Sequence, residues 1–186
     1  MANFRLHNPD CVIIHIHKTG GTTIRRHLWD GRFSGRSFGE MRPEWRNLYK
    51  FAFVRHPLDR FVSAYSYFNQ HRGFKGTIED FAAITMNVTI DHTGTRRTKP
   101  EIIRHHTIQQ THRFYCLTEA DELYRFENYD AEIARLASKV GLALDGVPHA
   151  NRSEHSTWEQ HITGPLLDQL CAFYARDFAD LGYPSP

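Results

Sequence analysis

Short apolar runs alternate with helical patterns along the whole chain. Runs typical of buried strands occupy residues 11–16, 50–54, 113–117 and 123–126, and a shorter one is possible at 37–38. Apolar periodicity and local start and stop signals predict helices over residues 22–29, 58–69, 81–84, 128–140 and 165–182. Strands that alternate with helices through short connections predict an α/β fold in which helices cover both faces of a central parallel sheet.

Individual residues mark several helix ends. Thr77 is followed three positions later by an acid, which predicts an N-terminal capping box. Gly141 and Gly182 are expected to end the helices before them, and Pro165 to open the last helix. Residues 86–100 are polar and have no clear period, so we expect a loop there.

The composition fits one globular domain. A chain of 186 residues with 40% hydrophobic and 24% charged residues can bury one substantial core, so we expect a single domain over residues 1–186. No apolar run approaches the roughly 18 residues of a membrane span, and residues 1–10 lack the apolar core of a secretory signal. We therefore expect a cytoplasmic protein in which Cys11, Cys116 and Cys171 are reduced thiols.

Positive charge is concentrated in the first third of the chain. Residues 1–60 carry 11 Lys plus Arg against 5 Asp plus Glu, although the formal net charge of the whole chain is only +2. A local basic excess favours a small polyanionic ligand, whereas the near-neutral total argues against nucleic-acid binding.

The segment CVIIHIHKTGGTTI at residues 11–24 has the pattern of a phosphate-binding loop. An apolar strand leads into a glycine turn and then a helix, so backbone N–H groups and the positive helix end can meet an anion. The candidate ligands are a lysine, the loop amides and three threonine hydroxyls, at Lys18, Thr19, Gly20, Gly21, Thr22 and Thr23. The usual triphosphate loop has its lysine after the glycines, and Lys18 precedes them, so a different phosphate ligand is expected.

A second candidate anion site follows the strand at residues 50–54. Arg55 comes at the carboxyl end of that strand, on the edge where open α/β sheets bind ligands. Arginine suits bidentate capture of a phosphate, and Ser63 on the next helix can donate to the same anion. Two phosphate subsites on one sheet edge would fit a nucleotide with phosphates at both ends of its ribose.

The two motifs resemble those of the sulfotransferases that use 3′-phosphoadenosine 5′-phosphosulfate (PAPS), especially their carbohydrate-modifying branch. HIHKTGGTT at residues 15–23 is similar to the family's 5′-phosphosulfate loop, and RHPLDRFVSAY at residues 55–65 to its 3′-phosphate motif. The resemblance continues weakly through YRFENYDAEI, VPHANRS and FYARDFADLGY, and adds Arg152 and Ser153 to the donor site. It implies a soluble bacterial-type member with a three-layer αβα, P-loop-NTPase-like sulfotransferase fold.

The resemblance also implies a general base between the two motifs, where family members carry histidine or glutamate after a glycine. Glu40 follows Gly39 here and is the first candidate for the catalytic base, with His105 or His106 in reserve. A solvated loop residue is the alternative interpretation of Glu40. His17 replaces the family's usual proline in the first motif, which removes no ligand.

Sulfuryl transfer implies an in-line transition state in which positioning and charge stabilisation dominate. Lys18 would neutralise charge on the leaving phosphate oxygen and is therefore a candidate catalytic residue as well as a ligand. No metal site is expected, because no carboxylate cluster accompanies the loop. The acceptor is expected to be a hydroxyl of a carbohydrate or other small metabolite, and arginines within residues 32–46 and 86–104 point to an anionic glycan.

Two other functions stay open on the sequence. One is a nucleotide-dependent small-molecule kinase that prefers ATP with magnesium, and the other is a non-catalytic module that binds adenosine bisphosphate or a glycan. His15 and His17 could chelate a metal, although packing is the more common role of such a pair. Arg55 and Arg60 could form surface ion pairs only.

Overall fold

The structure, a computed structural model, describes residues 3–37, 39–93, 98–144 and 157–186. Backbone contacts divide the chain into two compact units. The first unit comprises Met1–Arg55 and Gln110–Ser153, and the second comprises His56–Gln109 and Glu154–Pro186. Strands and helices are both abundant, so the mixed α/β class is confirmed. The single domain over residues 1–186 stays a prediction.

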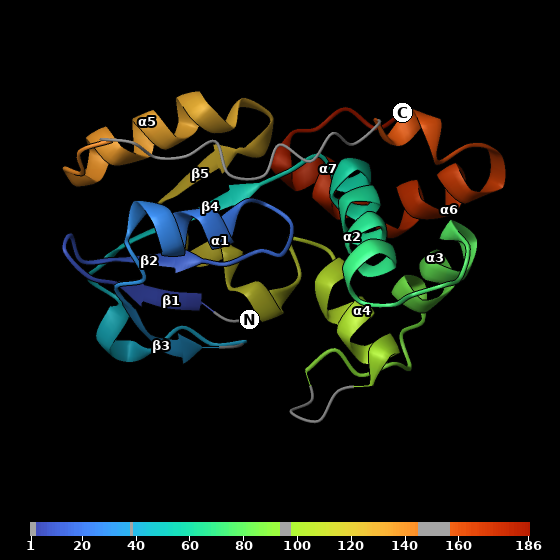
Figure 1. Cartoon of the computed structure of the whole chain (residues 1–186), viewed down its shortest axis with the longest axis horizontal. Coiled ribbons are helices and arrows are strands. Elements are labelled where there is room, and N and C mark those ends of the chain that lie inside the picture. Colours follow the sequence, from blue (N-terminus) through green and yellow to red (C-terminus); the bar gives the residue numbers. More distant parts are fainter. Residues whose placement is uncertain (1–2, 38, 94–97, 145–156) are drawn as a thin grey trace. The chain divides into compact units, whose positions relative to one another are not determined.

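The first unit contains a five-stranded sheet in the order β3-β1-β2-β4-β5 (Figure 1). Its strands are β1 (Asn3–Leu6), β2 (Cys11–Ile14), β3 (Phe33–Ser37), β4 (Tyr49–Val54) and β5 (Glu122–Arg125). The expected parallel arrangement is confirmed for β2, β4 and β5. It is wrong for β1, which pairs antiparallel with both β2 and β3. Only four residues join β1 to β2, and a parallel crossover needs a dozen or more.

Both faces of β2 and β4 are buried. Val12, Ile14, Ala52 and Val54 are each 0% exposed, as expected for strands covered on both sides. The side chains that alternate with them pack against α5 (Tyr129–Val140) and the π-helical segment Ile24–Leu28, which follows α1 (Gly21–Thr23). This core contains Cys11, Ile13, Phe51, Phe53, Ile24, Leu28, Trp29, Ile133 and Leu136.

The strand expected at residues 113–117 is wrong. Two 3₁₀ turns, Arg113–Tyr115 and Leu117–Glu119, stand there instead. Their N–H groups bond to nearby carbonyls, and Cys116 between them has a left-handed φ of 59°, so the chain cannot extend. Further 3₁₀ turns in this unit are Pro43–Trp45 and Phe126–Asn128.

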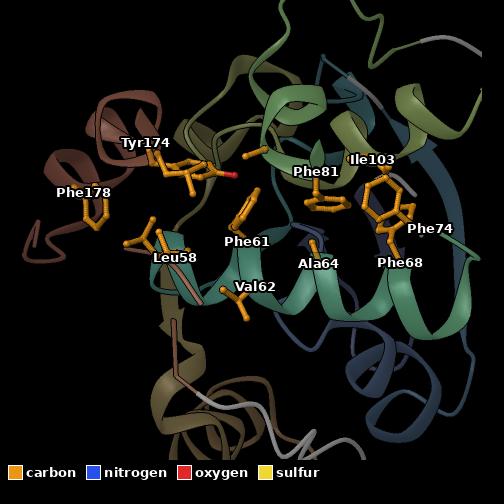
Figure 2. Packing of buried hydrophobic residues seen from close by; sticks show 13 residues of the cluster. Leu58, Phe61, Val62, Ala64, Phe68, Phe74, Phe81, Ile103, Tyr174 and Phe178 are labelled. Atoms are coloured by element: carbon orange, nitrogen blue, oxygen red, sulfur yellow. The ribbon is translucent and has the colours of Figure 1, made fainter. Parts of the chain in front are cut away.

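The second unit is helical. It contains α2 (Pro57–His71), α3 (Ile78–Met86), α4 (Lys99–Thr107), the 3₁₀ turn Trp158–Gln160, α6 (Gly164–Phe173) and α7 (Ala175–Leu181). One face of α2 presents apolar side chains that pack on those of the other helices (Figure 2). The labelled residues of this cluster are Leu58, Phe61, Val62, Ala64, Phe68, Phe74, Phe81, Ile103, Tyr174 and Phe178. In the described residues, no helix is long and apolar enough to cross a membrane.

The residues predicted to begin or end helices are confirmed more often than the predicted lengths of the helices and loops. Thr77 and Asp80 form the expected capping box of α3, and the left-handed Gly141 and Gly182 end α5 and α7. The loop expected at residues 86–100 is wrong at its far end, because α4 begins at Lys99. The helix expected over residues 165–182 is two helices, α6 and α7, which meet at Tyr174.

Candidate functional site

The two sequence motifs follow neighbouring strands of the sheet. β2 and β4 are parallel and in register, with Ile14 opposite Ala52, so the segments after them leave from the same edge. The glycine loop follows β2, and Arg55 immediately follows β4. The structure therefore places the Lys18 loop and Arg55 at the carboxyl edge of one sheet, where ligands bind in open α/β folds.

The loop is shaped by its own hydrogen bonds. The Thr19 hydroxyl donates to the Ile16 carbonyl at 2.9 Å, and the N–H groups of Thr23 and Ile24 donate to the Gly20 carbonyl. Lys18 has a φ of 68°, a conformation that few residues other than glycine adopt. Since the Thr19 hydroxyl proton is used within the loop, its backbone N–H is the donor that Thr19 can offer an anion.

The two glycines are needed because side chains press on the loop. A Cβ atom on Gly20 would lie 2.4 Å from the Tyr129 ring, and its φ of 82° is left-handed. A Cβ on Gly21 would lie 2.2 Å from the His15 ring. The Tyr129 hydroxyl also donates to the Gly20 carbonyl at 3.0 Å. The turn is therefore held tightly from two sides.

His15 and His17, in the segment between β2 and the glycine loop, pack with each other. Their rings meet edge to face at 5.3 Å, and His17 Nδ1 lies 3.2 Å from the Tyr115 hydroxyl. The backbone N–H of His15 donates to the Asn3 side chain. Within the described ranges, no group of three His, Cys, Asp or Glu side chains could hold a metal ion. The arrangement of the two histidines fits packing.

The Lys18 ammonium has an unusual electrostatic environment. Burial, and secondly the positive charge of Arg55, lower the pKa of Lys18 to about 8. Two cations within electrostatic reach of each other repel, and an anion bound beside them would relieve that repulsion. This environment suits a phosphate or sulfate group, which is the ligand that the sequence predicts.

Arg55 is held by two residues outside the two anion-site motifs, Phe126 and Gln110. Its guanidinium lies 4.5 Å from the centre of the Phe126 ring. Its backbone N–H donates to Gln110 Oε1 at 3.0 Å, and Gln110 Nε2 donates to its carbonyl at 2.7 Å. Sequence reasoning assigned neither residue a role beside Arg55. Phe126 follows the strand next to β4 and could have been found from that pairing, whereas nothing in the sequence marked Gln110.

Ser63 and Arg60 lie on α2, in the second unit, and both are buried. Arg60 donates to the carbonyls of His106, Thr107 and Ile108, the last residues around the end of α4. The surface ion pair considered for Arg60 is therefore wrong, because its guanidinium caps a helix inside the unit.

The three candidate bases fall in different units. Glu40 is exposed and lies in the first unit, as Lys18 does. The pKa of the Cys116 thiol is raised by burial, by the charge of Glu119 and, to a smaller extent, by the charge of Glu40. His105 and His106 are buried on α4 in the second unit, where their Nδ1 atoms lie 2.8 and 2.7 Å from backbone carbonyls. Because a carbonyl only accepts, each Nδ1 carries a proton that it donates to that carbonyl.

The two remaining donor candidates, Arg152 and Ser153, lie outside the described residues.

A glycine turn, a desolvated lysine and an arginine at the edge of neighbouring parallel strands are features of proteins that bind phosphorylated or sulfated ligands. A family model described as the sulfotransferase family matches residues 6–184 of the chain. The chain therefore belongs to the sulfotransferase family. No curated protein and no solved structure matches it.

Proposed function

We propose that this protein transfers the sulfuryl group of PAPS to a hydroxyl group of a carbohydrate or other small metabolite. The observation that carries the proposal is the Lys18–Arg55 pair at the edge of adjacent parallel strands, where burial and secondly the charge of Arg55 lower the pKa of Lys18. Family membership supports sulfuryl transfer in general, and the sulfotransferase family normally uses PAPS as the donor.

In this proposal the backbone N–H groups of Lys18, Thr19, Gly20, Gly21 and Thr22 hold the 5′-phosphosulfate. The Lys18 ammonium and the Thr22 and Thr23 hydroxyls bind the same group. Arg55 and Ser63 hold the 3′-phosphate, and Arg152 and Ser153 complete the donor site. We also propose the αβα, P-loop-NTPase-like arrangement that such a site implies. No metal has a part in it.

The chemistry needs few groups. The acceptor oxygen bonds to sulfur while the bond from sulfur to the 5′-phosphate oxygen breaks, and charge grows on that leaving oxygen. Lys18 stabilises this charge, and its pKa of about 8 leaves the ammonium protonated at neutral pH. The acceptor proton passes to a base, for which Glu40 is the first candidate and His105 or His106 the reserve.

An anionic glycan is a natural first acceptor to test. The segment after β3 carries exposed arginines, among them Arg42, whose guanidinium lies 5.3 Å from the Trp45 ring, and Arg46. These cations could meet the carboxylate or sulfate groups of such a sugar.

Calorimetric titration with 3′-phosphoadenosine 5′-phosphate (PAP) tests the donor site. We expect saturable binding that Lys18→Ala and Arg55→Ala each reduce by a factor of roughly ten or more. Tighter binding of ATP with magnesium than of PAP would contradict the proposal and favour a kinase.

For the base, Glu40→Gln should lower turnover but leave PAP affinity unchanged, and unchanged turnover would remove Glu40 from the mechanism.

A further inference from the structure

Arg55 is fixed at both its backbone and its side chain. Gln110 is 0% exposed and forms two hydrogen bonds to the backbone of Arg55, one accepted and one donated. This is the bonding that a further sheet strand would supply, and it satisfies both polar atoms of a buried amide. The pair extends the ordered backbone of β4 by one residue, to the residue that bears the guanidinium.

The guanidinium is fixed by an aromatic face. Phe126 is half-buried and follows β5, whose last residue Arg125 pairs with Val54 of β4. The Arg55 guanidinium lies over this ring at 4.5 Å, within the range of a cation–π contact. The Phe126 ring in turn packs on Tyr129 at 5.2 Å, and the Tyr129 hydroxyl donates to Gly20 in the glycine loop.

This support opposes the repulsion between the two cations of the site. Lys18 and Arg55 repel each other, and a guanidinium on a flexible side chain could lower that energy by moving toward solvent. An attractive aromatic face and a fixed backbone oppose that movement before a ligand arrives. Less conformational freedom is then lost on binding, which raises affinity.

We propose that Phe126 and Gln110 are positioning residues that set the preference of the donor site for a nucleotide bearing a 3′-phosphate. The inference rests on the proposed function, because it assigns Arg55 to that phosphate. Phe126 orients the guanidinium, and Gln110 holds the backbone from which the side chain starts.

The test compares PAP with adenosine 5′-phosphate, which lacks the 3′-phosphate, by calorimetry on the full chain. Phe126→Leu should weaken PAP binding roughly tenfold and change adenosine 5′-phosphate binding less than about twofold. Phe126→Tyr keeps an aromatic face and should keep the preference. Phe33→Leu is the matched control, because Phe33 is also half-buried and carries the Arg25 guanidinium at 5.1 Å.

A second arm separates positioning from general damage. In an Arg55→Ala background, Phe126→Leu should have no further effect on the ratio of the two affinities, because the group it positions is gone. Gln110→Leu should lower the same ratio in a protein that urea denaturation shows to be folded. Equal weakening of both nucleotides by Phe126→Leu would overturn the inference, and so would a further fall of the ratio in the Arg55→Ala background.

Failure of the proposed function would give a different result from failure of this inference alone. If the wild-type protein shows no preference for PAP over adenosine 5′-phosphate, the assignment of Arg55 to a 3′-phosphate fails and this inference fails with it. If the wild-type preference exists and survives in both Phe126→Leu and Gln110→Leu, only the inference is overturned.

Discussion

Lys18 carries its positive charge where burial and Arg55 make that charge costly. The folded protein without ligand thus holds the Lys18 proton less tightly than the unfolded chain does, because the pKa falls from 10.5 to about 8. The cost to stability is present below about pH 8 and fades as the pH rises toward the unfolded value. A bound anion reverses the preference, since it favours the charged lysine.

This reversal predicts that PAP binding depends on pH. Between about pH 7.5 and about pH 9, the affinity of the wild-type protein should fall roughly tenfold, as Lys18 of the free protein loses its proton. Lys18→Arg keeps its charge over this range, so its affinity should stay flat. The measurement is calorimetric titration with PAP at several pH values in both proteins. A parallel fall in Lys18→Arg would show that another group titrates.

The contact of His15 with the loop gives a steric prediction. Gly21→Ala places a methyl group against the His15 ring and should lower the free energy of unfolding by roughly 1–3 kcal/mol. In the double variant His15→Ala with Gly21→Ala, the loss should be smaller than the sum of the two single losses, because the ring is gone. Urea denaturation of the four proteins gives the coupling energy.

At Gly20, by contrast with Gly21, removing the neighbouring ring should not restore stability. A Cβ on Gly20 would meet Tyr129, but the Gly20 φ of 82° also disfavours any residue with a side chain. Tyr129→Ala should therefore fail to restore stability to Gly20→Ala. Full recovery at Gly20, or none at Gly21, would contradict this account of the loop.

At the scale of elements, Arg60 joins two helices of the second unit. Arg60→Met removes three hydrogen bonds to the last carbonyls around α4 and should cost roughly 3 kcal/mol of unfolding free energy. Arg176→Met is the control, because Arg176 is 78% exposed and pairs only with Asp180 among the contacts described. It should change stability by less than about 0.5 kcal/mol. Similar urea midpoints for the two variants would mean that Arg60 does not support α4.

The elements that could be predicted from the sequence are those whose pattern is local. β2, β4, β5, α2 and α5 each have an apolar period or run, and the capping box of α3 needs only Thr77 and Asp80. The sequence pattern did not predict α4, because three successive polar residues, Arg104, His105 and His106, are buried in it. Their burial depends on hydrogen bonds to a distant loop and to the helix backbone, which no local period reveals.

In the candidate site, too, the residues within local motifs could be predicted and those brought in by the fold could not. Lys18, Gly20, Gly21 and Arg55 stand in contiguous motifs, and the pairing of β2 with β4 brings their segments to one edge. Gln110 is 55 residues from Arg55 in the sequence, so its contact exists only in the folded chain. The choice among the proposed bases depends on tertiary placement too, which explains why motif spacing left Glu40, His105 and His106 all open.

At the scale of the whole molecule, the basic first third of the chain contains the glycine loop and Arg55, while the remainder is acidic on balance. An excess of positive charge around the donor site should speed the encounter with a ligand as highly charged as PAPS. The association rate of PAP in stopped flow should therefore fall as salt rises from about 50 to about 300 mM, with a smaller change in the dissociation rate. A salt-independent association rate would contradict this role of the charge.

The most direct test of sulfuryl transfer is an assay with sulfate-labelled PAPS and a panel of glycans, lipids and small phenols. The account predicts that label moves to a hydroxyl of a carbohydrate or other small acceptor, also in the presence of a metal chelator, and that Lys18→Ala and Arg55→Ala abolish the transfer. Tight binding of PAP without transfer of label to any acceptor, or transfer of phosphate from ATP instead, would contradict it.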